Sequence, residues 1–272
     1  MDLRNPKIVI AIAINVILLM AVAGSAFLWK TEPPTPTQPP VPVQPGEQFP
    51  TPPINPQPQV LNREQAVQTI TEQESYEMLE WLAHDEREGR MSGKRGNVVS
   101  AEYIAKEFKE YGLQVKMQRF KIRRMNPGPK NEEGNDYTDN IIGIIPGKSQ
   151  RQIIIGAHMD HIGYGPSMSR SNARNQIHNG ADDNASGTTV VLEIAEAFSK
   201  MERPNHTLVF VLFSAEEMGL IGSRHYVTEL SRAERENIDL MVNFDMVGWL
   251  KGQRTITVSG IREIPELVTI VE

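Results

Sequence analysis

The apolar positions of the chain follow two different spacings, which predict both helices and strands. Residues 75–84 and 97–111 keep apolar side chains at helical spacing, and Gly112 stands where a glycine often ends a helix. A further helix is expected to begin at an N-capping Ser186 and to end near Met201. Short β-branched and aromatic runs predict strands at 117–122, 140–145, 152–157, 207–213, 240–244 and 254–259. This alternation predicts an α/β three-layer sandwich, with a central mixed, mostly parallel sheet flanked by helices.

The first 30 residues are predicted to form a transmembrane segment ahead of this domain. Residues 8–29 are uncharged and almost wholly apolar, and at about 1.5 Å per residue they reach about 33 Å, enough to cross a bilayer core. Arg4 and Lys7 precede the span, so the N-terminus is expected in the cytoplasm and the remainder outside it. An uncleaved signal anchor is favoured. A signal peptide cleaved near residues 21–23, giving a secreted or periplasmic protein, is the alternative.

Residues 31–60 differ in composition from the rest of the chain. They contain twelve of the 19 prolines, interleaved with Thr, Gln and Val. Such a segment forms neither helix nor sheet, and it is predicted to be an extended, disordered stalk. A globular composition begins at Leu61, so residues 61–272 are predicted to form a single domain.

Charge and cysteine content exclude several classes of function. The net charge is −6 and no basic stripe stands out, so nucleic acid is not an expected partner. The chain has no cysteine, which excludes disulfides, thiolate zinc sites and a cysteine nucleophile.

Candidate chemistry lies directly after the predicted strands. The acidic residues and histidine found there form four clusters, namely His158/Asp160, Asp182/Asp183, Glu216/Glu217 and Asp245. Buried strands that end in carboxylates are costly unless the charges are paired or bind a cation, so these side chains are expected to share one crevice. Imidazole and carboxylate without thiol suit zinc, with manganese or cobalt as alternatives. A site this rich in carboxylate can hold two metal ions that share one bridging carboxylate.

Four motifs in this order resemble a known family. HMD (158–160), GADDNASG (180–187), SAEEMGLIGS (214–223) and NFDMVG (243–248) closely resemble those of the dizinc exopeptidases related to bacterial leucine aminopeptidase and aminopeptidase Y. The resemblance covers about residues 75–272. It implies a zinc-dependent exopeptidase that acts on peptides, most directly an aminopeptidase.

The resemblance also implies a role for each residue of the site. The implied metal ligands are His158, Asp183, Glu217 and Asp245. Of these, Asp183 would bridge two zinc ions, and Glu217 would bind only the second. Glu216 would be the general base that takes a proton from the attacking water and passes it to the leaving amine. Asp160 would orient His158 through the other ring nitrogen.

Other polar residues near these motifs receive weaker assignments. Asp182 is expected to shape its loop without binding metal. His161 and His178 would either touch substrate or be solvated. Structural or surface positions are expected for His84, His206 and His225.

The chain departs from the family pattern in one respect. The family has a further histidine on the second zinc, well downstream of NFDMVG, and this chain has no histidine after His225. We therefore expect a C-terminally truncated fragment or a degenerate homologue that hydrolyses peptides poorly. A related carboxypeptidase, a glutaminyl cyclase and a non-catalytic peptidase-like ectodomain are alternative functions, although the retained Glu216 argues against the last.

Overall fold

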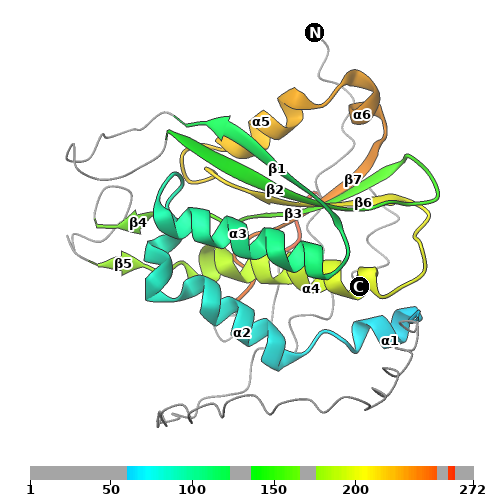
Figure 1. Cartoon of the computed structure of the whole chain (residues 1–272), viewed down its shortest axis with the longest axis horizontal. Helices are drawn as coiled ribbons and strands as arrows, with labels where there is room; N and C mark the ends of the chain where they lie inside the picture. Colours follow the sequence, from blue (N-terminus) through cyan, green and yellow to red (C-terminus); the bar gives the residue numbers. More distant parts are fainter. Residues whose placement is uncertain (1–59, 123–135, 166–175, 250–256, 261–272) are drawn as a thin grey trace, which may run out of the picture.

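The computed structural model describes residues 60–122, 136–165, 176–249 and 257–260 (Figure 1). These residues form a five-stranded sheet and a separate two-stranded ribbon. The sheet contains β1 (Gln114–Lys121), β2 (Tyr137–Ile145), β3 (Gln152–His158), β6 (Thr207–Phe213) and β7 (Ile238–Phe244), and the ribbon contains β4 (Gly163–Tyr164) and β5 (Ile177–His178). The α-helices are α1 (Arg63–Val67), α2 (Glu72–Ala83), α3 (Arg95–Glu110), α4 (Gly187–Ser199), α5 (Ile221–Glu229) and α6 (Arg232–Glu236). A 3₁₀ segment, η1 (Asp85–Arg90), and a π-helical turn, η2 (Ala181–Ser186), complete the helical elements.

The sheet is mixed, as the sequence predicted. Its strand order is β1-β2-β6-β3-β7. β3 is parallel to β6 and to β7, whereas β2 is antiparallel to β1 and to β6. β2 is therefore antiparallel to the other four strands of the sheet. Of the four pairings between neighbouring strands, two are parallel and two are antiparallel.

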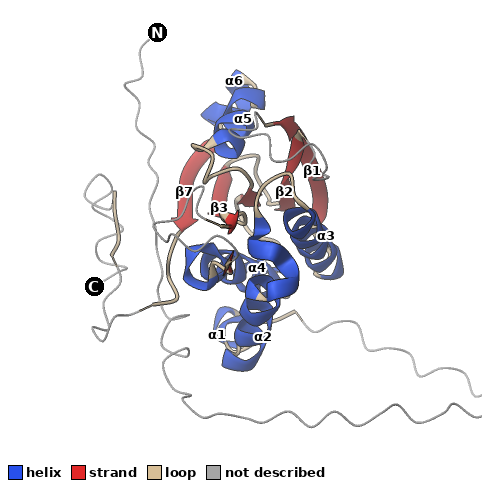
Figure 2. Cartoon of the chain, turned by 90° about the vertical axis from the view of Figure 1, so that its left-hand side faces the viewer, coloured by secondary structure: helices blue, strands red, loops and turns tan. Residues whose placement is uncertain are grey.

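Helices cover both faces of the sheet, and β6 shows why. Leu208, Phe210 and Leu212 belong to a core shared with α3 and α4, whereas the alternate residues, such as Val209 and Val211, pack on the other face with Tyr226 of α5. Figure 2 shows α5 and α6 on one side of the sheet and α1 to α4 on the other. A strand buried on both faces needs a continuous apolar run, which is the pattern of residues 207–213.

The structure agrees with one predicted helix end and differs from another. The helix predicted at 97–111 is α3, and Gly112 follows it with a φ of 80°, as a helix-ending glycine should. The predicted N-cap at Ser186 is wrong. Its backbone is helical and its hydroxyl donates to the carbonyl of Asp182 at 2.6 Å, because η2 leads directly into α4. Residues 257–259 of the strand predicted at 254–259 are not in a strand.

The predicted transmembrane segment (1–30) and all but the last residue of the predicted stalk (31–60) lie outside the described residues. Within the described part of the chain, no helix has both the length and the apolarity needed to cross a membrane.

One buried carboxyl group lies between α2 and α4. The side chain of Glu193 is 1% exposed and accepts a hydrogen bond from the Ser75 hydroxyl at 2.9 Å. Its other carboxyl oxygen is buried without a hydrogen-bond partner. Burial raises the pKa of Glu193 to about 7, although the Ser75 hydrogen bond opposes the rise.

This burial predicts a pH-dependent stability. Because the folded-state pKa is raised from 4.5 to about 7, the native state holds more protons in that window, and stability falls as the pH rises through it. We expect Glu193→Gln to be more stable than the wild type at pH 8 by roughly 2 kcal/mol, and to differ much less at pH 5. Urea unfolding at both pH values measures the difference. Glu229→Gln, at an exposed position on α5, should match the wild type at both, and an equal effect of Glu193→Gln at pH 5 and pH 8 would contradict the assignment.

Candidate metal centre

The parallel strands β3, β6 and β7 place the functional side chains at one edge of the sheet. In the strand register His158 is paired with Phe213, and Ala157 is paired with Phe244. The acidic segment after β6 and Asp245 after β7 therefore both begin beside His158. Carboxyl ends of parallel strands are where open α/β sheets place their ligand crevices. The predicted convergence of these strand ends is what the structure shows.

The first cluster of donor atoms contains His158, Asp183 and Asp245. His158 Nε2 lies 3.3 Å from Asp183 Oδ1 and 3.3 Å from Asp245 Oδ1. Ligands at about 2.0–2.1 Å around a tetrahedral zinc ion stand about 3.3–3.4 Å apart, so these two separations match those between zinc ligands. All three residues were predicted to be metal ligands.

The pKa of His158 shows that the carboxylates of this cluster strongly favour a positive charge beside them. Burial by itself would lower the pKa of His158, whose side chain is only 4% exposed. The carboxylates of Asp160, Asp183 and Asp245 outweigh burial and raise that pKa to about 12. His158 in turn lowers the pKa of Asp183 through their hydrogen bond. A metal ion that binds here takes the place of the imidazolium proton as the compensating charge.

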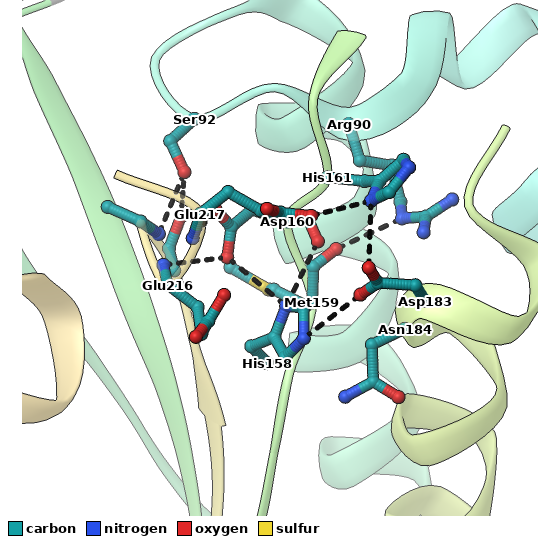
Figure 3. A network of polar contacts seen from close by, with 12 residues as sticks. Arg90, Ser92, His158, Met159, Asp160, His161, Asp183, Asn184, Glu216 and Glu217 are labelled. Atoms are coloured by element: carbon teal, nitrogen blue, oxygen red, sulfur yellow. Dashed lines mark hydrogen bonds and ion pairs between the residues drawn. The ribbon is translucent and has the colours of Figure 1, made fainter. Parts of the chain in front are cut away.

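A second cluster contains His161, Asp183 and Glu217. His161 Nδ1 lies 2.8 Å from Glu217 Oε1 and 3.9 Å from Asp183 Oδ2. Figure 3 shows Asp183 between the rings of His158 and His161, with one carboxylate oxygen toward each ring. This is the arrangement expected of the predicted bridge. His161 was not predicted to be a ligand, and its place in the cluster was missed.

Asp160 joins two loops of the site. The ring nitrogen Nδ1 of His158 lies 3.2 Å from the Asp160 carbonyl and 3.7 Å from its carboxylate, so both groups face the nitrogen that Asp160 was predicted to orient. The carboxylate also accepts the backbone N–H groups of Glu216 at 3.1 Å and Glu217 at 3.4 Å. Asp160 therefore also positions the acidic pair, which the sequence did not predict.

Glu216 belongs to neither donor cluster. No dashed contact in Figure 3 reaches its carboxylate among the residues drawn. Burial raises its pKa, and nearby Asp160, Glu217 and Asp245 add to the rise, while His158 opposes it. A half-buried carboxylate beside the ligands with a raised pKa is suited to accept and return a proton.

Ala215 sets the direction of this acidic pair. Its φ is 56°, a left-handed conformation that a residue with a Cβ rarely adopts. The N–H of Ala215 donates to the Ser92 hydroxyl at 2.8 Å, and that hydroxyl is hydrogen-bonded to Ser214 at 2.8 Å. Thr138 continues this buried network from β2. The hydroxyl groups of Ser92, Ser214 and Thr138 therefore hold the turn after β6 in place.

The residues around Asp183 hold its loop to the segment after β7. Asn184 donates to the carbonyl of Phe244 at 3.0 Å, and the Ser186 hydroxyl accepts the N–H of Val247 at 3.1 Å. Asp182 accepts the N–H of Gly248 at 2.8 Å, which fits its predicted role in shaping the loop. These hydrogen bonds keep Asp183 and Asp245 at a fixed separation.

A buried arginine, Arg90, lies behind the site and was not singled out from the sequence. It is 1% exposed and donates to the carbonyls of Leu82, Met159, Asn179 and Gly180 at 2.6–3.0 Å. Burial lowers the pKa of Arg90 to about 10, so it remains charged at neutral pH, and nearby Asp160, Asp183 and Glu217 favour that charge. Arg90 therefore links the two ligand-bearing loops and offsets part of their negative charge. Only its place in a glycine-containing turn was visible in the sequence.

The remaining histidines lie outside both donor clusters. His178 Nε2 is 3.0 Å from the Gly165 carbonyl, within the segments of the small ribbon. His84 accepts an N–H at the start of η1, His206 faces Asp239, and the ring of His225 packs against Phe120. These last three occupy structural or surface positions, as expected.

Fold and site together define an α/β protein that carries a metal centre of histidine and carboxylate at its sheet edge. The model of peptidase family M28 matches residues 140–266, so this part of the chain is similar to that family. The alkaline phosphatase isozyme conversion protein of Escherichia coli is 31% identical over 185 residues, which are 66% of this chain and 52% of that protein. Aminopeptidase YwaD of Bacillus subtilis is 36% identical over 117 residues, which are 42% of this chain and 23% of that protein. The chain thus spans about half of the first relative and less of the second.

A solved structure supports the fold. BSAP, a zinc aminopeptidase from Bacillus subtilis, matches with a TM-score of 0.53 and 21% sequence identity, over 66% of this chain and 71% of that one. The predicted α/β class is confirmed, the predicted resemblance to a zinc exopeptidase family agrees with these matches, and the donor set described above fits zinc.

The place of Arg90 predicts that it supports metal binding from a distance. We expect Arg90→Met to lower zinc affinity by about 10–100-fold, because the loops that carry His158 and Asp183 lose their common donor. Competition with a chromophoric chelator measures the affinity, and circular dichroism confirms folding. Arg87→Met is the matched control. Arg87 is also buried in η1, but it stacks on Trp81 at 3.7 Å and should leave zinc affinity unchanged. Equal affinities for both variants would contradict this role.

Proposed function

We propose that the chain carries the active site of a zinc-dependent exopeptidase, most directly an aminopeptidase that removes N-terminal residues from peptides. The observation that carries the proposal is the position of Glu216. It lies beside two donor clusters that share Asp183, yet it belongs to neither of them. A hydrolase needs a carboxylate that the metal does not occupy, because the attacking water must lose a proton.

The residues of the site divide the work of peptide hydrolysis. Bound zinc supplies Lewis acidity, which polarises the scissile carbonyl and makes an attacking water more acidic. Glu216 takes the proton of that water and returns it to the leaving amine. Asp160 holds the backbone of Glu216 through a hydrogen bond of 3.1 Å, so the base stays at a fixed distance from His158.

The alternative functions have less support. A glutaminyl cyclase or a carboxypeptidase is the alternative enzyme, but the Asp-Asn-Ala-Ser-Gly and Ala-Glu-Glu patterns of this chain are among those that carry its resemblance to aminopeptidases. The relative that is 36% identical is named an aminopeptidase. A non-catalytic ectodomain would have no need of Glu216, which is present with a raised pKa.

Replacement of the base tests the proposed chemistry. We expect Glu216→Gln to retain zinc and to hydrolyse aminoacyl-nitroanilides about 10²–10⁴-fold more slowly, since a carboxamide cannot accept the proton. Zinc content is measured by elemental analysis, and turnover at high protein concentration. Asp245→Asn should instead lower zinc content, because it removes a ligand of the first cluster. Equal rates of hydrolysis by the wild type and by Glu216→Gln would contradict the proposal.

We further propose that the domain works outside the cytoplasm, on the stalk of residues 31–60 and anchored through residues 1–30. The apolar span, the basic residues before it and the proline-rich segment after it support this arrangement. Protease added to intact cells should remove a C-terminal tag from a protein that sediments with membranes. Deletion of residues 1–30 should protect the tag. Release of the tagged protein into the soluble extracytoplasmic fraction would support signal cleavage instead, and a protected tag on the wild type would contradict export.

A further inference from the structure

Side chains from other segments accept four successive backbone N–H groups, those of residues 214–217. Asn140 accepts the first at 3.0 Å and Ser92 accepts the second at 2.8 Å. The carboxylate of Asp160 accepts the third at 3.1 Å and the fourth at 3.4 Å. These three side chains therefore set the position of the acidic segment, and two of them are uncharged.

We propose that Ser92 is a positioning residue, whose hydroxyl keeps Glu216 beside the metal centre by holding the backbone of Ala215. The inference rests on the proposed function, in which Glu216 is the general base. Figure 3 shows the Ser92 hydroxyl pointing at the turn that carries Glu216. Because Ser92 acts through the backbone of this turn, it takes no part in the chemical step itself.

The backbone of Ala215 needs this support. Its φ of 56° is a left-handed conformation that residues with a Cβ rarely adopt. The residue is 0% exposed, so without the Ser92 oxygen its N–H would be buried and unsatisfied. Glu216 follows directly in the chain, so a change in the backbone angles of Ala215 would redirect the Glu216 side chain.

The hydroxyl groups behind Ser92 form a chain of hydrogen bonds with one direction. Thr138 donates its proton to Asn97 Oδ1 at 2.7 Å, so it accepts in its 2.7 Å contact with Ser214. Ser214 has then given its proton to Thr138, so Ser92 is the donor in their 2.8 Å contact. The oxygen of Ser92 is left to accept the N–H of Ala215.

This hydroxyl chain, made of Ser92, Ser214, Thr138 and Asn97, is buried throughout. None of its four side chains belongs to a residue that is more than 4% exposed. Away from water each hydrogen bond polarises the next, and the loss of one member leaves its neighbours unsatisfied. The chain ties the end of β6 to β2, to α3 and to the loop before α3, so the acidic segment is anchored on three sides.

The competing explanation is that these hydroxyl groups only stabilise the core. A purely structural hydroxyl would loosen the whole fold when removed. A positioning hydroxyl would instead loosen residues 214–217 and lower kcat, while KM and the bound zinc stay as they are. Ser100 is the matched control, because it is 0% exposed and its hydroxyl donates to the Gly96 carbonyl at 2.9 Å, within α3.

Hydrogen exchange and kinetics on the 272-residue chain separate the two roles. We expect the Ala215 amide to exchange about 10–100-fold faster in Ser92→Ala, because it loses its acceptor, while the amides of β3 keep their rates. With aminoacyl-nitroanilides, kcat should fall about 10–100-fold at unchanged KM, since the base is displaced and the substrate contacts are not. Zinc content, measured by elemental analysis, should stay at the wild-type level. Ser100→Ala should match the wild type in all three measurements.

Two substitutions of Thr138 test the hydroxyl chain beyond Ser92. Thr138→Val replaces the hydroxyl by a methyl group and should cause the same changes to a smaller extent, because Ser214 can then donate to Asn97 at 3.4 Å. Thr138→Ser keeps the hydroxyl and should restore the wild-type values. A Thr138→Ser variant as impaired as Thr138→Val would make packing the cause and overturn the proposal.

The outcomes for Ser92→Ala decide the role of Ser92. Unchanged exchange of the Ala215 amide would overturn the proposal, as would faster exchange with an unchanged kcat. Loss of zinc, or equal changes in Ser92→Ala and Ser100→Ala, would assign the hydroxyl a structural role and also overturn it. A wild type that hydrolyses no peptide would refute the proposed function, and the exchange of Ala215 would then decide by itself whether Ser92 holds this segment.

Discussion

Excess negative charge at the carboxyl edge of the sheet is the constraint on which the whole site depends. The carboxylates that meet there are those of Asp160, Asp183, Glu216, Glu217 and Asp245. These carboxylates raise the pKa of His158 by stabilising its protonated ring, and their charge adds to the burial that raises the pKa of Glu216. Buried or half-buried charges of one sign are stable only when cations compensate them. Metal ions at the two donor clusters satisfy this requirement, and they leave one carboxylate available for proton transfer.

The scaffold holds these charges together mainly through backbone hydrogen bonds. Asp160 accepts two N–H groups from the acidic pair, and Arg90 donates to carbonyls of three separate segments. Asn184 and Ser186 connect the loop of Asp183 to the residues after β7. Hydrogen bonds of this kind fix the side-chain rotamers and the loops, so the metal-binding side chains stay in place even when no metal ion offsets their negative charge. The π-helical turn η2 belongs to this arrangement, since it presents Asp183 before α4 begins.

Much of the site was predictable because its residues follow strands whose hydrophobic pattern is strong. His158, Glu216, Glu217 and Asp245 could each be placed at a strand end from the sequence. The distinction between Asp182 and Asp183 came from the family resemblance, and the structure gives its physical basis, since Asp182 is engaged by the N–H of Gly248. The N-cap at Ser186 was predicted wrongly because the hydroxyl finds a different partner in the turn before it.

The sequence by itself determined the α/β class, the strands that carry chemistry and the donor types that suit zinc, because hydrophobic spacing and residue chemistry are local properties. Only the tertiary structure decided the order β1-β2-β6-β3-β7, the burial of Arg90 and the place of His161 beside Glu217. The contacts of His161 with Glu217 and of Arg90 with Met159 join positions that are 56 and 69 residues apart in the sequence. No local pattern encodes such contacts, because they form only when strands and loops pack around a common edge.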